Sequence, residues 1–304
     1  MATRFDNSEL KQLLLFAQGV VDGLTGGRHR SSHRGSSVEF KEHRSYSRGD
    51  SPRTIDWKLY GKTDRLFIRQ FEDETNLRSM LLVDQSGSMG YAGSRAGGRT
   101  KHDFAIRLAA SLAMLLVRQQ DAVGLATFDH SLDQFIPPRS NTAHLQTLLK
   151  SLTGSKPRGE TQLGHALLNA AKQLRHRGIS RGIVFIVSDF FDDIATLRPA
   201  LQHFGKQGHE VIAFQVWDYD EWNFPFQNRT QFRSLESGKE TIVDPAAFRA
   251  RYLEKARQFR DELANQFSAL RIDPVFCSTE EDCIEILRGW LHRRQRSIAG
   301  GRKL

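Results

Sequence analysis

Cysteines, long apolar runs and a recognisable leader segment are scarce or missing in this sequence. Its 304 residues include only two cysteines, Cys277 and Cys283, with no histidine between them at zinc-ligand spacing. Their number and spacing exclude a disulfide framework and indicate two buried free thiols. No apolar run approaches the roughly 18 residues that a membrane-spanning helix needs, and the first residues lack the apolar core of a signal peptide. We therefore expect a cytoplasmic protein without a transmembrane segment.

An excess of basic residues is the main feature of the composition. The formal net charge is +9, while a hydrophobic content of 39% and a charged content of 26% fit a soluble globular protein. Much of the charge lies in residues 28–34 and 288–303. Such stretches can contact nucleic acid or anionic lipid, but we favour a solvated surface that keeps the protein soluble.

Apolar runs alternate with helical patterns through the middle of the chain. Strands are predicted at 80–84, 122–128, 183–189 and 211–216, with an edge strand at 132–136. Helices are predicted between them, at 102–119, 142–152, 162–175 and from Asp192 or Asp193 to 204. This alternation predicts an α/β fold, a doubly wound and mostly parallel sheet with helices on both faces.

Further segments flank this predicted sheet. Residues 1–77 would form an N-terminal helix over 6–21, a basic loop over 28–37 and a small β-rich arm over 38–74. A C-terminal extension would contain a hairpin over 229–243, a helix over 245–269, a short strand near Val275 and a helix over 280–291. We therefore divide the chain into residues 1–77, a domain over 78–292 that includes the extension, and a basic tail over 293–304.

Polar side chains follow the ends of two predicted central strands. Asp84 ends the apolar run 80–83, and Ser86 and Ser88 follow it at alternate positions. Asp189 ends the strand 183–189, and Thr161 lies just before a predicted helix. Because open α/β sheets bind ligands outside the carboxyl ends of their strands, we expect these five side chains to meet there.

Two carboxylates and three hydroxyls would form an oxygen-only cluster that suits a hard cation. The hydroxyls of Ser86, Ser88 and Thr161 are the candidate direct ligands, and Asp84 and Asp189 would act through water molecules. Magnesium is the expected ion, with manganese and calcium left open. Neutral direct ligands leave the ion electrophilic, so that it would accept a carboxylate from another protein. The alternative is a strand end whose serines cap the next helix.

The motif Asp84-x-Ser86-x-Ser88, followed by Thr161 and Asp189, resembles the metal-ion-dependent adhesion site of von Willebrand factor A domains. All five positions hold the expected residue types, on a chain with the matching order of strands and helices. The resemblance covers roughly residues 78–220. It implies a doubly wound sheet whose bound metal ion accepts an acidic residue of a partner protein.

A second group of motifs lies just before this site and resembles the family called domain of unknown function 58. The motifs are Glu39-Phe40, Arg44-x-Tyr46-x-x-Gly49-Asp50, Arg53-x-Ile55-Asp56-Trp57 and Arg69-x-Phe71-Glu72. This resemblance covers most of the chain and implies a MoxR-type AAA+ ATPase as partner, in a chaperone or metal-insertion system. Many members of that family carry membrane helices, which this sequence lacks.

A metal-dependent hydrolase and a basic nucleic-acid-binding protein are the alternative functions. A two-metal hydrolase would use more carboxylates, and Ser86 as a nucleophile would need a base such as His102 or His165. The sequence has no G-x-S-x-G elbow, and the Gly-rich segment 90–100 lacks the phosphate-binding P-loop pattern. A nucleic-acid-binding protein would show a recognised motif or aromatic residues among its basic ones. We therefore expect a non-enzymatic, metal-dependent protein-binding module.

Overall fold

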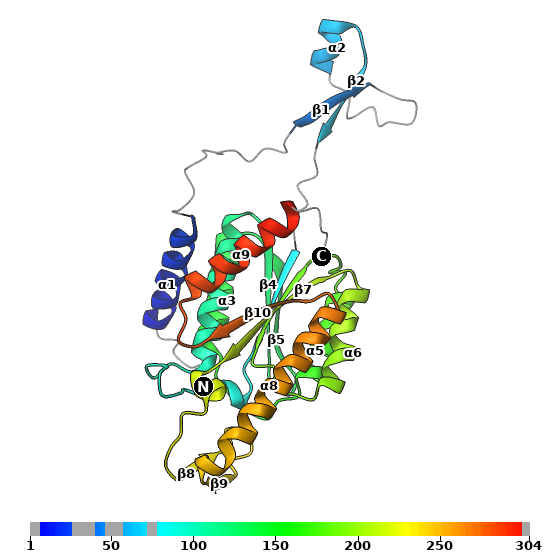
Figure 1. Ribbon diagram of the computed structural model, residues 1–304. Helices are drawn as coiled ribbons and strands as arrows, with labels where there is room; N and C mark the ends of the chain where they lie inside the picture. The colour runs from blue at the N-terminus through cyan, green and yellow to red at the C-terminus, as the bar shows by residue number, and fades with distance from the viewer. Residues whose placement is uncertain (1–6, 26–39, 46–56, 72–77, 300–304) are drawn as a thin grey trace. The chain divides into compact units, whose positions relative to one another are not determined.

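Six strands form the central sheet in the order β10–β7–β6–β3–β4–β5, as the computed structural model shows (Figure 1). Neighbouring strands run parallel except for β5, which is antiparallel to β4. The strands are β3 (Arg78–Asp84), β4 (Ala122–Phe128), β5 (Leu132–Arg139), β6 (Ile183–Ser188), β7 (Glu210–Trp217) and β10 (Asp273–Ser278). The predicted mostly parallel α/β sheet is confirmed.

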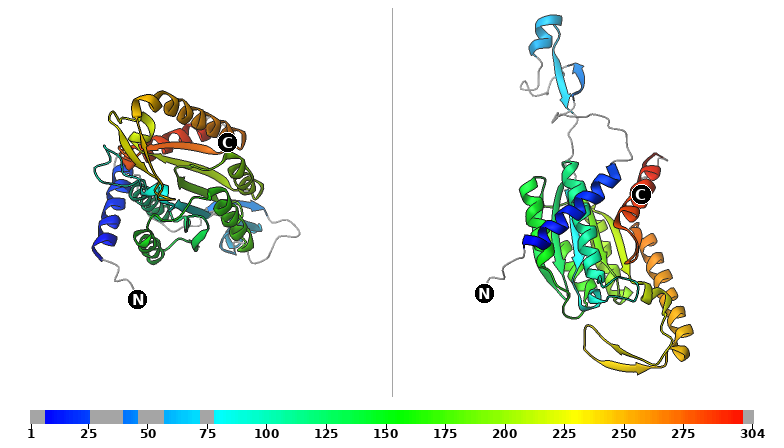
Figure 2. Two further views of the ribbon diagram at one scale, coloured as in Figure 1. Left: turned by 90° about the horizontal axis from the view of Figure 1, so that it is seen from below. Right: turned by 90° about the vertical axis from the view of Figure 1, so that its left-hand side faces the viewer.

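Helices cover both faces of the sheet (Figures 1 and 2). The first face carries α1 (Asn7–Thr25), α3 (Lys101–Arg118), α4 (Thr142–Gly154) and α9 (Cys283–Ala299). The second face carries α5 (Leu163–His176), α6 (Ile194–Lys206) and α8 (Pro245–Ala269). Side chains of β3 alternate between the two apolar cores, because successive residues of a strand point to opposite faces.

The position of β3 explains where a site can form. The chain runs from β3 to β4 on one side, and after β5 it returns to place β6 on the other side of β3. Val83 of β3 lies opposite Val187 of β6 in a parallel register. The residues that follow these two strands therefore meet at one sheet edge, at the point where the strand order reverses.

The structure describes residues 7–25, 40–45, 57–71 and 78–299, which fall into two units. One unit spans 28–76. In it, β1 (Phe40–Ser45) pairs antiparallel with β2 (Phe67–Phe71). A helix that was not predicted, α2 (Trp57–Thr63), lies between these two strands in the sequence. The predicted basic loop over 28–37 and the motif residues over 46–56 lie outside the described residues. The division differs from the one predicted, because residues 1–27 belong to the larger unit, where α1 packs on α3.

The C-terminal extension follows the prediction up to its last helix. A hairpin pairs β8 (Thr230–Arg233) with β9 (Glu240–Val243), directly before α8. The predicted helix end at residue 291 is wrong, because α9 continues to Ala299 through most of the predicted basic tail. Arg294 explains this extension, since its guanidinium forms two hydrogen bonds with the carboxylate of Glu210. No helix within the described part of the chain is both long and apolar enough to span a membrane.

Both edge strands of the sheet contain proline. β5 includes Pro137 and Pro138, which lie where its register with β4 shifts opposite Gly124. The shift has a physical cause, since proline has no N–H to donate to a strand ladder. β10, at the other edge, includes Pro274.

The predicted free thiols are confirmed, because Cys277 of β10 and Cys283 of α9 are both buried and unpaired with each other.

Candidate metal site

The two predicted aspartates lie at the carboxyl ends of adjacent strands, and both are fully buried. Asp84 is the last residue of β3, and its carboxylate accepts a hydrogen bond of 2.8 Å from the Ser86 amide and one of 2.6 Å from the Ser188 hydroxyl. Asp189 directly follows β6 and accepts a bond of 3.1 Å from the Phe191 amide. Both carboxylates are thereby fixed in orientation, Asp84 by bonds from its own loop and from β6, and Asp189 by a bond from its own loop.

The loop that carries Ser86 and Ser88, which we call the serine loop, connects the two aspartates. The hydroxyls of Ser86 and Ser88 lie 3.1 Å apart, and the Ser88 hydroxyl donates to Asp189 Oδ2 at 2.8 Å. Residues Gly87–Gly90 form a 3₁₀ turn, and Ser86 makes no side-chain capping bond to it. The alternative that these serines serve as helix caps is therefore not supported at Ser86. The structure brings four predicted site residues into one hydrogen-bonded group.

The loop that carries Thr161 lies against the serine loop. The Gly87 amide donates to the Gly159 carbonyl at 3.0 Å, and the Arg158 amide donates to the Gln85 carbonyl at 2.8 Å. The Thr161 hydroxyl itself donates to a carboxylate oxygen of Glu236, which lies in the turn of the β8–β9 hairpin. All three predicted loops therefore meet, together with the turn of the predicted hairpin, which was not expected at this site.

A buried lysine also belongs to the cluster. Lys101, the first residue of α3, has a side chain 0% exposed, and its ammonium contacts Asp189 at 2.8 Å and Glu221 at 2.6 Å. It lies 5.0 Å from the ring centre of Phe191. Burial alone would lower the pKa of Lys101, but Asp189 and Glu221 outweigh it and raise that pKa above its usual value. Lys101 therefore stays charged.

The cluster has more negative than positive groups. Its carboxylates are Asp84, Asp189, Glu221 and Glu236, whereas Lys101 is the cation that contacts two of them. Burial, followed by the charge of Asp189, raises the pKa of Asp84 to about 7. Burial likewise raises the pKa of Glu221, which Lys101 partly opposes. A divalent cation at this point would favour the charged forms of these carboxylates, which burial disfavours.

The spacing of the two serine hydroxyls is one that magnesium could accept. Adjacent ligands of an octahedral Mg²⁺ at about 2.1 Å lie about 3.0 Å apart, close to the 3.1 Å between the hydroxyl oxygens of Ser86 and Ser88. In the described part of the chain, no group of three or more His, Cys, Asp or Glu side chains is arranged to hold a metal ion. A cation at this site would therefore have to be held partly by hydroxyl oxygens, and those of Ser86 and Ser88 lie together.

Sequence reasoning missed Lys101, Glu221, Glu236 and Ser188. One signal was present for Lys101: a lysine at the first position of a helix opposes the helix dipole, which favours acidic residues there. Ser188 was hidden at the end of an apolar strand. Glu221 and Glu236 reach the site only through the packing of later segments, and their local sequence carries no such signal.

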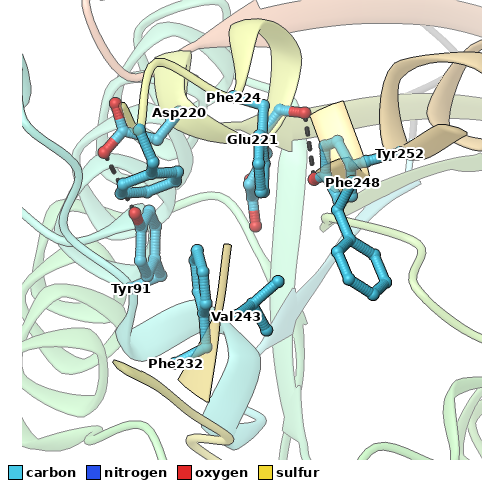
Figure 3. Close-up of a pocket in the computed structure, with 9 residues that line it drawn as sticks. Tyr91, Asp220, Glu221, Phe224, Phe232, Val243, Phe248 and Tyr252 are labelled. Carbon is cyan, nitrogen blue, oxygen red and sulfur yellow. Dashed lines mark hydrogen bonds between the residues drawn. The ribbon is translucent and has the colours of Figure 1, made fainter. Parts of the chain in front are cut away.

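A cavity of about 360 Å³ lies beside the cluster, between the hairpin and the helices α7 (Tyr219–Asn223) and α8. Figure 3 shows its lining, in which Phe232 and Val243 come from the two hairpin strands and Phe248 and Tyr252 from α8. The Tyr252 hydroxyl donates to the Glu221 carbonyl at 3.1 Å. The cavity therefore adjoins the same residue that pairs with Lys101.

Comparisons with known proteins identify a family for this chain. The family model described as "Protein of unknown function DUF58" matches residues 42–262. An uncharacterized protein of Mycobacterium tuberculosis is 26% identical over 294 residues, covering 96% of this chain and 90% of that protein. Among solved structures, the conserved hypothetical protein BatB from Bacteroides thetaiotaomicron is 14% identical with a TM-score of 0.46, covering 73% of this chain and 100% of that one. The VWA domain of SpRpn10 is 13% identical with a TM-score of 0.40, covering 69% and 93%.

Proposed function

The chain belongs to the DUF58 family, and from this premise we propose that it is a metal-dependent protein-binding module of the von Willebrand factor A type. The proposed ion is Mg²⁺, with Mn²⁺ or Ca²⁺ as substitutes. Ser86, Ser88 and Thr161 would hold it directly, and Asp84 and Asp189 would orient its water ligands. The protein would act in the cytoplasm and without catalysis.

One observation carries this proposal. The hydroxyls of Ser86 and Ser88 and the carboxylate of Asp189 form a continuous hydrogen-bonded row at the ends of β3 and β6, with Thr161 on the loop packed against it. Hydroxyl ligands leave the charge of the ion largely uncompensated, so that an acidic side chain of another protein would be attracted to it. The proposed partner is a MoxR-type AAA+ ATPase, the class that the family resemblance implies.

The hydrogen bonds of Ser86 favour binding over hydrolysis. Its hydroxyl bonds to Ser88, and no bond from it to a histidine is found among the described residues. His102, a candidate base, instead contacts the Ser155 hydroxyl at 3.1 Å. Because an activated serine requires a base within hydrogen-bond reach, this arrangement supports a module that holds an ion rather than one that cleaves a bond.

The test measures metal binding and partner binding in the same variants. Isothermal titration with Mg²⁺ should give binding to the wild type and none to Asp84→Ala, while Ser86→Ala and Thr161→Ala should each weaken it. Co-purification of a MoxR-type ATPase from the same organism should require Mg²⁺, be lost in EDTA and fall in the same variants.

Thr147→Ala is the matched control, because Thr147 is an exposed threonine of α4 whose hydroxyl donates to the Ala143 carbonyl of its own helix. It should bind Mg²⁺ and the ATPase as the wild type does. Circular dichroism should show all variants folded. If Ser86→Ala and Thr161→Ala bind like the wild type, the site is assigned to the wrong residues. Retention on RNA or heparin that EDTA does not affect would favour the nucleic-acid alternative instead.

A further inference from the structure

We propose that Glu236, in the turn of the β8–β9 hairpin, is a ligand of the same metal ion in the free protein. This inference rests on the proposed function, because it assumes that the serine and threonine hydroxyls hold a divalent cation. Glu236 would occupy the place that a partner's carboxylate needs, so that the protein carries its own acidic ligand.

Contacts from two loops place the Glu236 side chain at the site. Its carboxylate accepts the hydrogen bond of Thr161, one of the three candidate direct ligands. A Cβ added at Gly87, which lies between the two serines, would be 3.2 Å from the Cγ of Glu236 and 2.8 Å from the carbonyl oxygen of Leu235. The side chain therefore lies beside the backbone of Gly87 in the serine loop and within hydrogen-bond reach of the Thr161 hydroxyl.

The hairpin turn holds Glu236 in a defined position. The Ser234 amide donates to the Lys239 carbonyl at 2.8 Å, and the Gly238 amide donates back to the Ser234 carbonyl at 2.9 Å. Gly238 has a φ of +68°, which residues with a side chain rarely adopt. A closed turn of this kind reduces the entropy lost when its carboxylate coordinates an ion.

Aromatic contacts of Phe232 anchor the strands of the hairpin. Phe232 of β8 stacks on Phe224 with ring centres 5.8 Å apart and packs edge-on against Phe226 at 5.0 Å. The cavity of about 360 Å³ lies between Phe232 and Val243 of the hairpin on one side and α8 on the other (Figure 3). The outer side chains Leu235 and Ile242 are 49% and 60% exposed. This packing leaves room for the turn to withdraw when a partner's carboxylate replaces Glu236.

The chemistry of Glu236 matches the role. A carboxylate oxygen is a preferred ligand of Mg²⁺ and Mn²⁺, whereas a glutamate that only accepted a threonine hydroxyl would contribute little beyond that bond. Glu236 also adds a negative charge to a group in which the candidate direct ligands are neutral. The ion would then bind more tightly in the free protein than three hydroxyls alone allow.

The test uses Mn²⁺ alone, whose bound water molecules can be counted from their effect on water proton relaxation. In Glu236→Gln, a water molecule should replace the carboxylate, so that the relaxivity of the bound Mn²⁺ rises and its affinity falls about 10-fold or more. Glu236→Asp keeps the charge but shortens the side chain by one methylene. It should resemble Glu236→Gln if the carboxylate coordinates the ion directly, and the wild type if only its charge matters, which would overturn the inference.

Glu240→Gln is the matched control, because Glu240 is an exposed glutamate of the same hairpin that bonds to Gln231 in the opposite strand. It should bind Mn²⁺ with wild-type affinity and relaxivity. Hydrogen exchange of residues 230–243 should slow when Mg²⁺ is added to the wild type and to Glu240→Gln, but not to Glu236→Gln.

Two outcomes separate this inference from the proposed function. If Asp84→Ala abolishes Mn²⁺ binding while Glu236→Gln retains wild-type affinity and relaxivity, Glu236 is not a ligand and the metal site itself stands. If the wild type binds no Mn²⁺, both the inference and the proposed function are overturned.

Discussion

Replacing Lys101 with methionine should destabilise the protein strongly in the absence of metal. Methionine has a similar length and fills the same buried space, so that the change removes the positive charge and its three N–H donors rather than the packing. In the wild type this charge is shared by Asp189 and Glu221, whose side chains are 0% and 16% exposed. The variant would leave both carboxylates buried without their cation.

The size of the effect follows from this burial. Removing one partner of a buried ion pair costs about 3–5 kcal/mol, because the remaining charge is desolvated without compensation. In a domain of this size, 1 kcal/mol shifts the melting temperature by about 2–4 °C. We therefore expect Lys101→Met to melt about 6–20 °C below the wild type in EDTA. Glu221 lies nearer to solvent than Asp189, which favours the lower part of that range.

The assay is thermal and urea unfolding in EDTA and in Mg²⁺. A bound divalent cation restores positive charge near Asp189, so that Mg²⁺ should stabilise Lys101→Met more than it stabilises the wild type. An ion present at 100 times its dissociation constant adds about 2.7 kcal/mol. Lys172→Met, at an exposed position of α5, is the control and should unfold like the wild type in both buffers.

Unchanged stability of Lys101→Met in EDTA would refute this reasoning, because it would mean that Asp189 and Glu221 need no cation. A second variant, Lys101→Met with Glu221→Gln, sharpens the test. It removes one of the two uncompensated charges and should recover part of the lost stability. If it is instead less stable than Lys101→Met alone, the two carboxylates are not the source of the loss.

Three further predictions concern the scaffold. Gly182→Ala should cost about 1–3 kcal/mol in urea unfolding, because the new Cβ would lie 2.1 Å from the Arg78 carbonyl oxygen; the control Gly205→Ala, which meets nothing within 4 Å, should not destabilise. Burial lowers the pKa of His102 from 6.5 to about 4. As the pH falls, His102 is therefore protonated in the unfolded chain before it is protonated in the folded protein. The free energy of unfolding should decrease between about pH 6.5 and about pH 4, by up to about 3 kcal/mol. A pH series of unfolding midpoints should show a smaller loss in His102→Gln, and an equal loss would contradict the assignment. Leu201→Ala, in the core under α6, should cost about 2–5 kcal/mol in the same unfolding assay, and a loss below 1 kcal/mol would show that this core is loosely packed.

The central sheet could be predicted because its strands are apolar runs bounded by polar turns. β3 and β6 are buried on both faces, so that almost every residue between their ends is apolar. The hairpin and α8 were also predicted, and the structure has them close to the expected residues. The end of α9 was misjudged because its basic last turns resemble a solvated tail. Only the fold brings Glu210 near enough to pair with Arg294.

The candidate site could be predicted in part for a similar reason. Asp84 and Asp189 follow strands whose parallel order alone places them at one edge. Lys101 and Glu236 could not be assigned to the site, because each reaches it from an element whose approach depends on tertiary packing. Lys101 is 88 residues from its partner Asp189 in sequence, and Glu236 is 75 residues from Thr161. Motif reading finds the ligands on the strand ends but not the groups that later segments add to them.

The prolines in the two outer strands restrict how this protein can assemble with others. A partner that joins a sheet by adding a strand needs a row of free N–H and C=O groups along an outer edge. Pro137, Pro138 and Pro274 interrupt that row on both sides, and such interruptions discourage polymerisation through backbone pairing. Complexes of this protein should therefore form through the side chains of its loops rather than through extension of its sheet. Such complexes can dissociate again.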